Sequence, residues 1–312
     1  MANCKRFTFK SAAGQELDAI LWTPEGEYAE HPKGILQFIH GMVEHMDMYE
    51  GMARFIADAG YIVTGETHLG HGPKAKTPGY FADKDGWDML LKDIHTLRCM
   101  TEKQYPGLPY FLIGHSMGSF LTRCYLQDHS QGLAGAIIVG TGNQPEAILK
   151  LGIAITSFLC SMGKGKKPSK FFHDLSFRNY NSRYENVTSS NAWITRDEAV
   201  LAERAKDPYC DFYFTVSGYR DMFLGIRRMM DQERTNKMAK DLPVLFISGD
   251  MDPVGSYGKE VKTSADSFRE AGLKDITLKL YPGARHDLFH ETNRIEVLGD
   301  IANWLDSHLK KK

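Results

Sequence analysis

The chain has 312 residues, 42% hydrophobic and 25% charged, which is the composition of an ordinary soluble globular protein with a substantial core. Its formal net charge of −1 gives no electrostatic case for nucleic acid as the main partner. The first residues lack the apolar core of a signal peptide, and the five cysteines form neither a CxxC pair nor a cluster with histidine. We therefore expect a cytoplasmic protein with reduced thiols that needs no metal and no organic cofactor.

Strands and helices alternate along the first 142 residues. Continuous apolar runs such as 34–41 are typical of strands buried on both faces, whereas apolar residues at helical spacing between 49 and 59 indicate a helix. In chain order, the pattern predicts strands at 6–9, 17–22, 34–41, 61–66, 110–115 and 133–140, and helices at 49–59, 88–103 and 117–128. The first two strands are joined by a turn at Gly14, which predicts a hairpin.

The alternation stops between residue 143 and about residue 235, where the sequence is mostly helical in pattern and rich in aromatic residues. It resumes with a strand at 243–248, a helix at 257–271, a strand at 277–282 and a closing helix. Strands that alternate with helices indicate a mostly parallel sheet covered on both sides. We therefore predict an α/β fold with a core of residues 1–142 and 236–312 and an inserted helical cap of residues 143–235.

A candidate nucleophile lies in the stretch GHSMG, residues 114–118, which has the G-x-S-x-G pattern. The stretch follows an apolar strand and opens a predicted helix, the context in which a serine occupies a strained turn with its hydroxyl exposed. The alternative is a glycine-rich turn in which Ser116 only caps the helix. The strand and the helix on either side favour Ser116 as a nucleophile.

A serine that attacks a carbonyl group creates a negative oxygen, which needs hydrogen-bond donors already in place. The backbone N–H of Met117, directly after the serine, is one expected donor. The other is expected from the loop after an earlier strand, where His40 and Gly41 end the buried run 34–41. We assign it to the N–H of Met42, against the alternative that these residues form a plain strand-to-helix turn.

The base is expected after the serine in chain order, beyond a late strand. His286 lies in a Pro/Gly loop a few residues past the strand at 277–282 and is the predicted base. His290 is the competitor, but its place at the start of the last helix predicts that it caps the helix or faces solvent.

The acid is Asp250 or Asp252, both in the stretch SGDMDPVG after the strand at 243–248. Asp250 is still close to the strand, where we expect it to brace the loop by accepting backbone N–H bonds. Asp252 lies farther out, and the proline after it forces an extended conformation. Gly255 makes the alternative, a helix capped by Asp252, a poor one. We choose Asp252 as the residue that receives the imidazole Nδ1–H.

Taken together, the stretches GHSMGS, IHGMVEH, THLGHG, SGDMDPVG and GARHDLFHE resemble the α/β-hydrolase family of monoacylglycerol lipases and lysophospholipase-like enzymes, also classed with serine aminopeptidases. They occur in order over essentially the whole chain. The resemblance implies hydrolysis of carboxylic esters through an acyl-serine intermediate, with Ser116, Asp252 and His286 as the triad. In that family the acid is the last residue of a Gly-x-x-Asp pattern, which is Asp252 here.

One departure from the family concerns the substrate. Its glyceride hydrolases read His-Gly-x-Gly-Glu-His-x-x-Arg-Tyr after the oxyanion strand, whereas this chain keeps Glu44 but has Met48 at the arginine position. Phe289, three residues after His286, replaces a residue that tends to be polar in those enzymes. We therefore predict that Glu44, Met48 and Phe289 contact the substrate, a small ester with an apolar acyl group, and that the polar grip on a glycerol head group is weakened.

Two other functions remain open on the same fold: a serine peptidase or amidase, and a ligand receptor that turns substrate over very slowly. The cap adds a further alternative, because residues 147–162 are apolar over most of the helix circumference. This helix either lines an acyl-binding tunnel or touches a lipid surface, helped by Lys164, Lys166 and Lys167, or it is simply buried in the cap.

Overall fold

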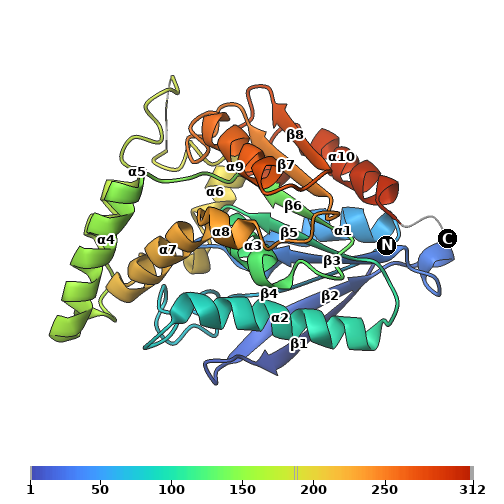
Figure 1. Cartoon of the computed structure of the whole chain (residues 1–312), viewed down its shortest axis with the longest axis horizontal. Coiled ribbons are helices and arrows are strands. Elements are labelled where there is room, and N and C mark those ends of the chain that lie inside the picture. The colour runs from blue at the N-terminus through green and yellow to red at the C-terminus, as the bar shows by residue number, and fades with distance from the viewer. Residues whose placement is uncertain (1, 186, 188, 310–312) are drawn as a thin grey trace.

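The computed structural model describes residues 2–185, 187 and 189–309, which form one eight-stranded sheet flanked by helices (Figure 1). The strands are β1 (Asn3–Lys10), β2 (Glu16–Thr23), β3 (Gly34–Ile39), β4 (Tyr61–Glu66), β5 (Tyr110–His115), β6 (Gly135–Val139), β7 (Val244–Gly249) and β8 (Ile276–Tyr281). Their order across the sheet is β1-β2-β4-β3-β5-β6-β7-β8. Only β2 runs against its neighbours β1 and β4, and every other pair is parallel. The predicted mostly parallel α/β fold and the hairpin at the N-terminus are confirmed.

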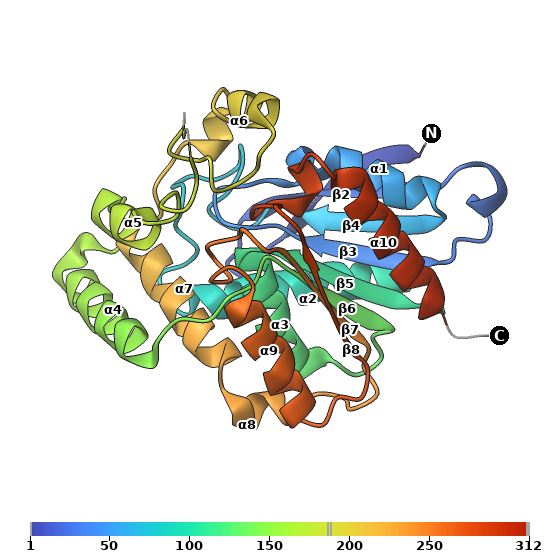
Figure 2. The same cartoon turned by 90° about the horizontal axis from the view of Figure 1, so that it is seen from above.

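Helices cover both faces of the sheet (Figure 2). On one face, α1 (Glu50–Asp58) and α10 (Arg294–Ser307) pack their apolar side chains against the strands in one buried cluster. On the other face lie α2 (Gly86–Gln104), α3 (Met117–His129) and α9 (Lys259–Glu270). The central strands are therefore buried along their whole length, which explains why their sequences read as continuous apolar runs rather than as an alternating pattern.

The segment predicted as the cap, residues 143–235, lies between β6 and β7. It contains α4 (Glu146–Leu159), α5 (Lys170–Phe177), α6 (Glu198–Arg204), α7 (Val216–Met229) and α8 (Gln232–Thr235), and no strand among its described residues. Figures 1 and 2 place α4 and α5 next to each other beyond one end of the sheet, and α6 at the same end but apart from α4. α7 packs against both α4 and α3, and it buries Tyr219, Met222 and Ile226 in the core. α7 belongs to the predicted cap by sequence but packs into the core, so the boundary between core and cap stays a prediction.

The apolar surface of α4 faces outward. Ile148, Leu151 and Phe158 are exposed by 61%, 63% and 64% respectively. The alternative of a buried cap helix is therefore wrong. Among the described residues, Glu146–Lys164 is the one helical stretch long and apolar enough to cross a membrane, judged by length and composition alone.

Candidate active site

Four loops that carry the predicted site residues follow β3, β5, β7 and β8. These strands are parallel, so their carboxyl ends meet at one edge of the sheet. Met42 follows β3, Ser116 follows β5, Asp252 follows β7 and His286 follows β8. The topology therefore brings together residues that lie up to 244 positions apart.

Ser116 occupies the strained turn between β5 and α3. Its φ of 54° and ψ of −121° lie in a region that non-glycine residues rarely adopt. The turn is also crowded, because a β-carbon on Gly118 would lie 1.9 Å from the carbonyl oxygen of Ile39. A glycine is thus required for α3 to approach β3, as the G-x-S-x-G pattern predicts. The arrangement is that of a nucleophile elbow.

His286 and Asp252 form a buried pair. The Nδ1–H of His286 donates to Oδ2 of Asp252 at 2.9 Å, and both side chains are almost completely buried. The carboxylate is held from behind, because it also accepts from Oγ of Ser248 at 3.1 Å and from the N–H of Val254 at 2.8 Å. With Nδ1 as the donor, Nε2 of His286 is the basic atom, and it is buried without a hydrogen-bond partner among the described residues.

Asp250, the alternative acid, points elsewhere. Its Oδ1 accepts from the N–H of Gly283 at 2.7 Å and so ties the loop after β7 to the loop after β8. The structure therefore places Asp252, and not Asp250, against the imidazole of His286.

The loop after β3 lies beside the serine. A β-carbon on Gly41 would be 3.0 Å from Cβ of Ser116, so only glycine allows this approach. The Nδ1–H of His40 donates to the carbonyl oxygen of Gly41 at 2.8 Å. That carbonyl shares a planar trans peptide with the N–H of Met42, so the bond also fixes the direction of the expected oxyanion donor.

His40 is held in this neutral form from its other side. Its Nε2 accepts from the backbone N–H of His68 at 2.9 Å. Burial, together with the nearby His68 and His71, lowers the pKa of His40 well below its usual range, which agrees with one donating and one accepting nitrogen. From the sequence, His40 was expected only to end the strand that precedes Gly41.

A buried ionic network also holds the loop after β3. Oε2 of Glu44 accepts from the N–H of Gly41 at 2.5 Å and from the hydroxyl of Tyr49 at 2.6 Å. Tyr49 in turn lies 3.0 Å from Nδ1 of His115, and Nε2 of His115 lies 3.3 Å from the carbonyl oxygen of His286. Because the hydroxyl of Tyr49 donates its proton to Glu44, its oxygen accepts from Nδ1–H of His115, and the carbonyl oxygen of His286 accepts from Nε2–H. Both nitrogens of His115 therefore donate, and the ring is an imidazolium. The network thus links the loop after β3, residues 40–49 (the oxyanion loop), to the backbone of His286, the predicted base.

The pKa values agree with a charged Glu44–His115 pair. Burial by itself would lower the pKa of His115, but the carboxylate of Glu44 outweighs it and raises that pKa. Burial would likewise raise the pKa of Glu44, and the charge and hydrogen bond of His115 lower it instead. The pair is therefore ionised around neutral pH.

The three predicted substrate-binding residues differ in their surroundings. Glu44 uses its carboxylate for the protein's own donors, as described above. Phe289 is 3% exposed, and its ring packs against those of Phe38 and Tyr49. Met48 is partly exposed, and its sulfur lies 3.4 Å from Sγ of Cys210 in the cap segment. Contact of any of the three with a substrate stays a prediction.

The expectation for His290 is wrong. It lies in a short turn, residues Leu288–His290, before α10 begins at Arg294, so it neither caps that helix nor points into solvent. Nδ1 of His290 donates to Asp287 at 2.8 Å, and Nε2 donates to the carbonyl oxygen of Met48 at 2.9 Å. Burial disfavours the charged ring, but Asp287 outweighs it and raises the pKa of His290. His290 therefore fastens the loop after β8, which carries the predicted base His286 (the base loop), to the oxyanion loop.

The cap segment reaches the base as well. The backbone N–H of His286 donates to the carbonyl oxygen of Trp193 at 3.3 Å, and the N–H of Asp287 donates to that of Ile194 at 2.7 Å. The rings of Trp193 and His286 have centroids 5.0 Å apart. Residues 193–194 of the cap segment therefore hold the base loop in place.

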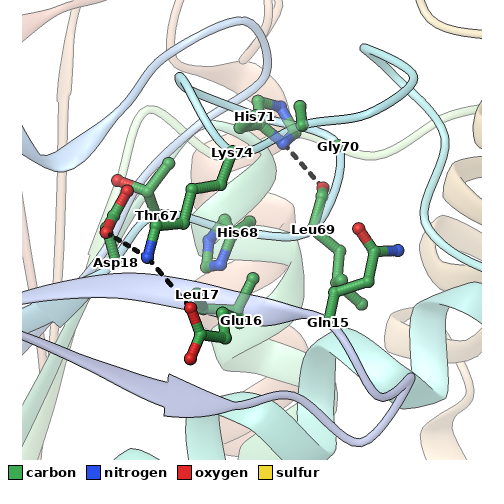
Figure 3. Close-up of a pocket in the computed structure, with 11 residues that line it drawn as sticks. Gln15, Glu16, Leu17, Asp18, Thr67, His68, Leu69, Gly70, His71 and Lys74 are labelled. Atoms are coloured by element: carbon green, nitrogen blue, oxygen red, sulfur yellow. Dashed lines mark hydrogen bonds and ion pairs between the residues drawn. The ribbon is translucent and has the colours of Figure 1, made fainter.

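A small polar pocket and one cluster of possible metal ligands lie outside the predicted triad. Figure 3 shows a small pocket between the start of β2 and the loop after β4, in which Lys74 lies 3.1 Å from Asp18 and 3.6 Å from Glu16. His45, Asp207 and Cys210 are the one group of possible metal ligands found among the described residues. His45 and Asp207 already pair directly at 2.7 Å, so this group is a complete ion pair as it stands.

Comparison with known proteins places the chain in a family. Residues 30–293 match the Hydrolase_4 family model, described as serine aminopeptidase, S33. A monoacylglycerol lipase from Mycolicibacterium smegmatis is 25% identical over 306 residues, which cover 97% of each chain.

Solved structures agree in fold. A thermostable carboxyl esterase from Bacillus coagulans, solved in complex with glycerol, is 30% identical with a TM-score of 0.89 and covers 98% of this chain and 99% of its own. A soluble variant of the monoglyceride lipase from Saccharomyces cerevisiae, in complex with a substrate analog, has a TM-score of 0.75 at 23% identity, covering 98% of this chain and 96% of its own. The chain therefore belongs to the serine aminopeptidase S33 family of α/β-hydrolases, and it is an ester hydrolase.

Proposed function

We propose that the protein cleaves carboxylic esters through an acyl intermediate on Ser116. The observation that carries the proposal is the buried His286–Asp252 pair at the same sheet edge as the strained Ser116. Nε2 of His286 takes the proton from Oγ of Ser116 as this oxygen attacks the ester carbonyl carbon. The N–H groups of Met42 and Met117 bind the oxyanion that forms.

The tetrahedral intermediate then collapses, the carbon–alcohol oxygen bond breaks, and His286 returns its proton to the leaving alcohol. A water molecule then loses a proton to His286 and attacks the acyl carbon. The bond between this carbon and Oγ of Ser116 breaks, His286 returns the proton to Oγ, and the acid is released. Asp252 keeps the imidazole in the tautomer with Nε2 free and stabilises the imidazolium that forms in each half-reaction.

The substrate is a small lipid ester. The relatives include monoacylglycerol lipases, and the esterase from Bacillus coagulans was solved with glycerol. Met48 and Phe289 in this chain favour a substrate that depends more on its acyl group than on a glycerol head group. The cytoplasm is its proposed location.

The cap segment delivers such a substrate from a lipid surface. Its exposed large apolar side chains are Ile148, Leu151, Ile155, Phe158, Met162, Phe171 and Leu175. Exposed lysines 164, 166 and 167 lie five to eight residues beyond Leu159, the last residue of α4. An apolar patch bordered by basic residues is the pattern of a helix that lies on an anionic lipid surface.

The test is a series of p-nitrophenyl esters from acetyl to palmitoyl, run beside monoacylglycerols of the same acyl length and peptide p-nitroanilides, with Ser116→Ala as the control. We expect rates that peak at one acyl length and fall at least about 10³-fold in the variant. Equal rates for the wild type and Ser116→Ala on every ester would contradict the proposal. Cleavage of the anilides alone would favour the peptidase alternative.

A further inference from the structure

Arg204, the last residue of α6 in the cap segment, reaches across to the loop that carries Met42. Its Nη2 donates to the carbonyl oxygen of Val43 at 2.8 Å, and its Nη1 lies 3.8 Å from the sulfur of Met48. The two partners are 161 and 156 positions away in the sequence. This contact joins the cap segment to the residue next to the expected oxyanion donor.

The loop needs such a restraint because its backbone is strained at this point. Val43 has a φ of 57°, in the left-handed region, which a β-branched side chain disfavours by about 1–2 kcal/mol. A residue in that conformation persists only where its surroundings hold it. Gly41 is fixed by His40 and Glu44, and Arg204 fixes the carbonyl of Val43. Met42 lies between these two points.

The charges around Arg204 also suit this place. Burial disfavours its charged form, but the carboxylates of Glu44 and Asp287 help to raise the pKa of Arg204. Its guanidinium charge in turn favours the ionised form of Glu44, which holds the N–H of Gly41. Arg204 therefore supports the loop twice, by a direct bond to Val43 and through Glu44.

Two neighbouring contacts follow the same path. Oδ2 of Asp207 lies 2.7 Å from Nε2 of His45, and Sγ of Cys210 lies 3.4 Å from the sulfur of Met48. Residues 204–210 of the cap segment thus contact the oxyanion loop at three successive points.

We propose that Arg204 is a positioning residue for the oxyanion hole, supplied by the cap segment. Met48 stands where the related glyceride hydrolases carry an arginine, and the guanidinium of Arg204 lies against its side chain. The oxyanion hole is then complete only when the cap segment is seated on the loop. This inference rests on the proposed ester hydrolysis at Ser116.

The test compares Arg204→Ala and Arg204→Lys with the wild type, using Lys206→Ala as a matched control on an exposed cation two residues away. We expect kcat for the best p-nitrophenyl ester to fall about 10- to 100-fold in Arg204→Ala with KM within about twofold, because a misplaced donor weakens binding of the transition state more than of the substrate. Arg204→Lys retains part of the activity, since it keeps the charge but loses the second contact. Lys206→Ala is expected to match the wild type.

Amide hydrogen exchange of residues 41–49 gives a second measurement that does not depend on activity. We expect faster exchange in Arg204→Ala and wild-type exchange in Lys206→Ala, with both proteins otherwise folded by circular dichroism. Placing an arginine in the loop itself, as Met48→Arg in the Arg204→Ala background, is expected to restore kcat, which a merely structural cap contact would not do.

The outcomes separate this inference from the proposed function. Unchanged exchange in Arg204→Ala, or an unchanged kcat when the wild type is active through Ser116, overturns the role of Arg204 and leaves the ester hydrolysis standing. A wild type without activity dependent on Ser116 contradicts the proposed function, and the exchange measurement still decides whether Arg204 holds the loop.

Discussion

Replacing Glu44 with glutamine removes the negative charge that pairs with His115 and that accepts the hydrogen bond from the N–H of Gly41. The substitution keeps the shape of the side chain but weakens the bonds to the N–H of Gly41 and the hydroxyl of Tyr49, at roughly 1 kcal/mol for each lost charge-assisted contribution. It also removes the larger of the two counter-charges that act on the buried His115, the other being Asp287. We therefore expect Glu44→Gln to be folded but less stable, and slower on esters because the loop is looser.

The pH dependence of this loss follows from His115. Burial disfavours the charged ring of His115, but the charge and hydrogen bond of Glu44, with further contributions from Asp287 and the carbonyl oxygen of His286, raise its pKa from 6.5 to about 9. This net shift corresponds to roughly 3 kcal/mol of stability, to which Glu44 contributes most. Because the pKa is higher in the folded state, this stability is complete below pH 6.5 and disappears as the pH rises through about 9. For Glu44 the folded pKa, about 2, is below the ordinary value of 4.5, so the same interaction is also lost as the pH falls from 4.5 towards 2. The pair is most stabilising between these limits.

The measurement is urea unfolding of the wild type and Glu44→Gln at intervals from pH 6 to pH 10. Other histidines also have raised pKa values, His45 among them, so the informative quantity is the difference in unfolding free energy between the two proteins. We expect the advantage of the wild type to shrink by about 3 kcal/mol over this range. Glu50→Gln, at an exposed glutamate paired with Arg54, is the matched control and should cost under about 0.5 kcal/mol. A wild-type advantage that stays constant from pH 6 to pH 10 would refute the reasoning.

Three further predictions test separate parts of the structure. Asp252→Asn should lower kcat about 10³- to 10⁴-fold by losing the correct tautomer, while Asp250→Asn should change it far less; similar losses in both would contradict the assignment of the acid. Gly118→Ala should prevent stable folding, since its β-carbon would lie 1.9 Å from a backbone oxygen, whereas Gly299→Ala, with nothing within 4 Å, should leave the melting temperature equal or higher. Phe158→Glu should reduce sedimentation with anionic vesicles but leave hydrolysis of a soluble acetyl ester unchanged, and undiminished sedimentation would exclude α4 as the lipid contact.

The parts of this molecule that the sequence predicts well depend on local pattern. β4 and β5 coincide with the predicted ranges 61–66 and 110–115, because strands buried on both faces have no polar positions to blur the pattern. The strained turn at Ser116 could be predicted because the strand, the glycines and the helix that form it are contiguous in the sequence. The choice between Asp250 and Asp252 also followed from local chemistry, since the proline after Asp252 moves it away from the strand.

The rest depends on contacts between distant segments, which no local pattern records. Arg204 reads as one more charged residue at the end of a cap helix, and only the fold brings it to Val43. His290 was misplaced because its partners, Asp287 and Met48, include one from 242 positions away. The orientation of α4 was undecided for a related reason: an apolar helix has the same sequence whether a protein core or a lipid surface covers it.

The cap segment contacts two loops of the candidate site, the one that carries His286 and the one that carries Met42. The carbonyl oxygen of Trp193 accepts from the N–H of His286 on the base side, and Arg204 donates to Val43 on the oxyanion side. Eleven positions separate Trp193 from Arg204, so a shift of this one stretch would move both restraints. We therefore expect that a cap lifted at a lipid surface would alter the base and the oxyanion donor together, because the two are held by the same segment and not by independent parts of the core.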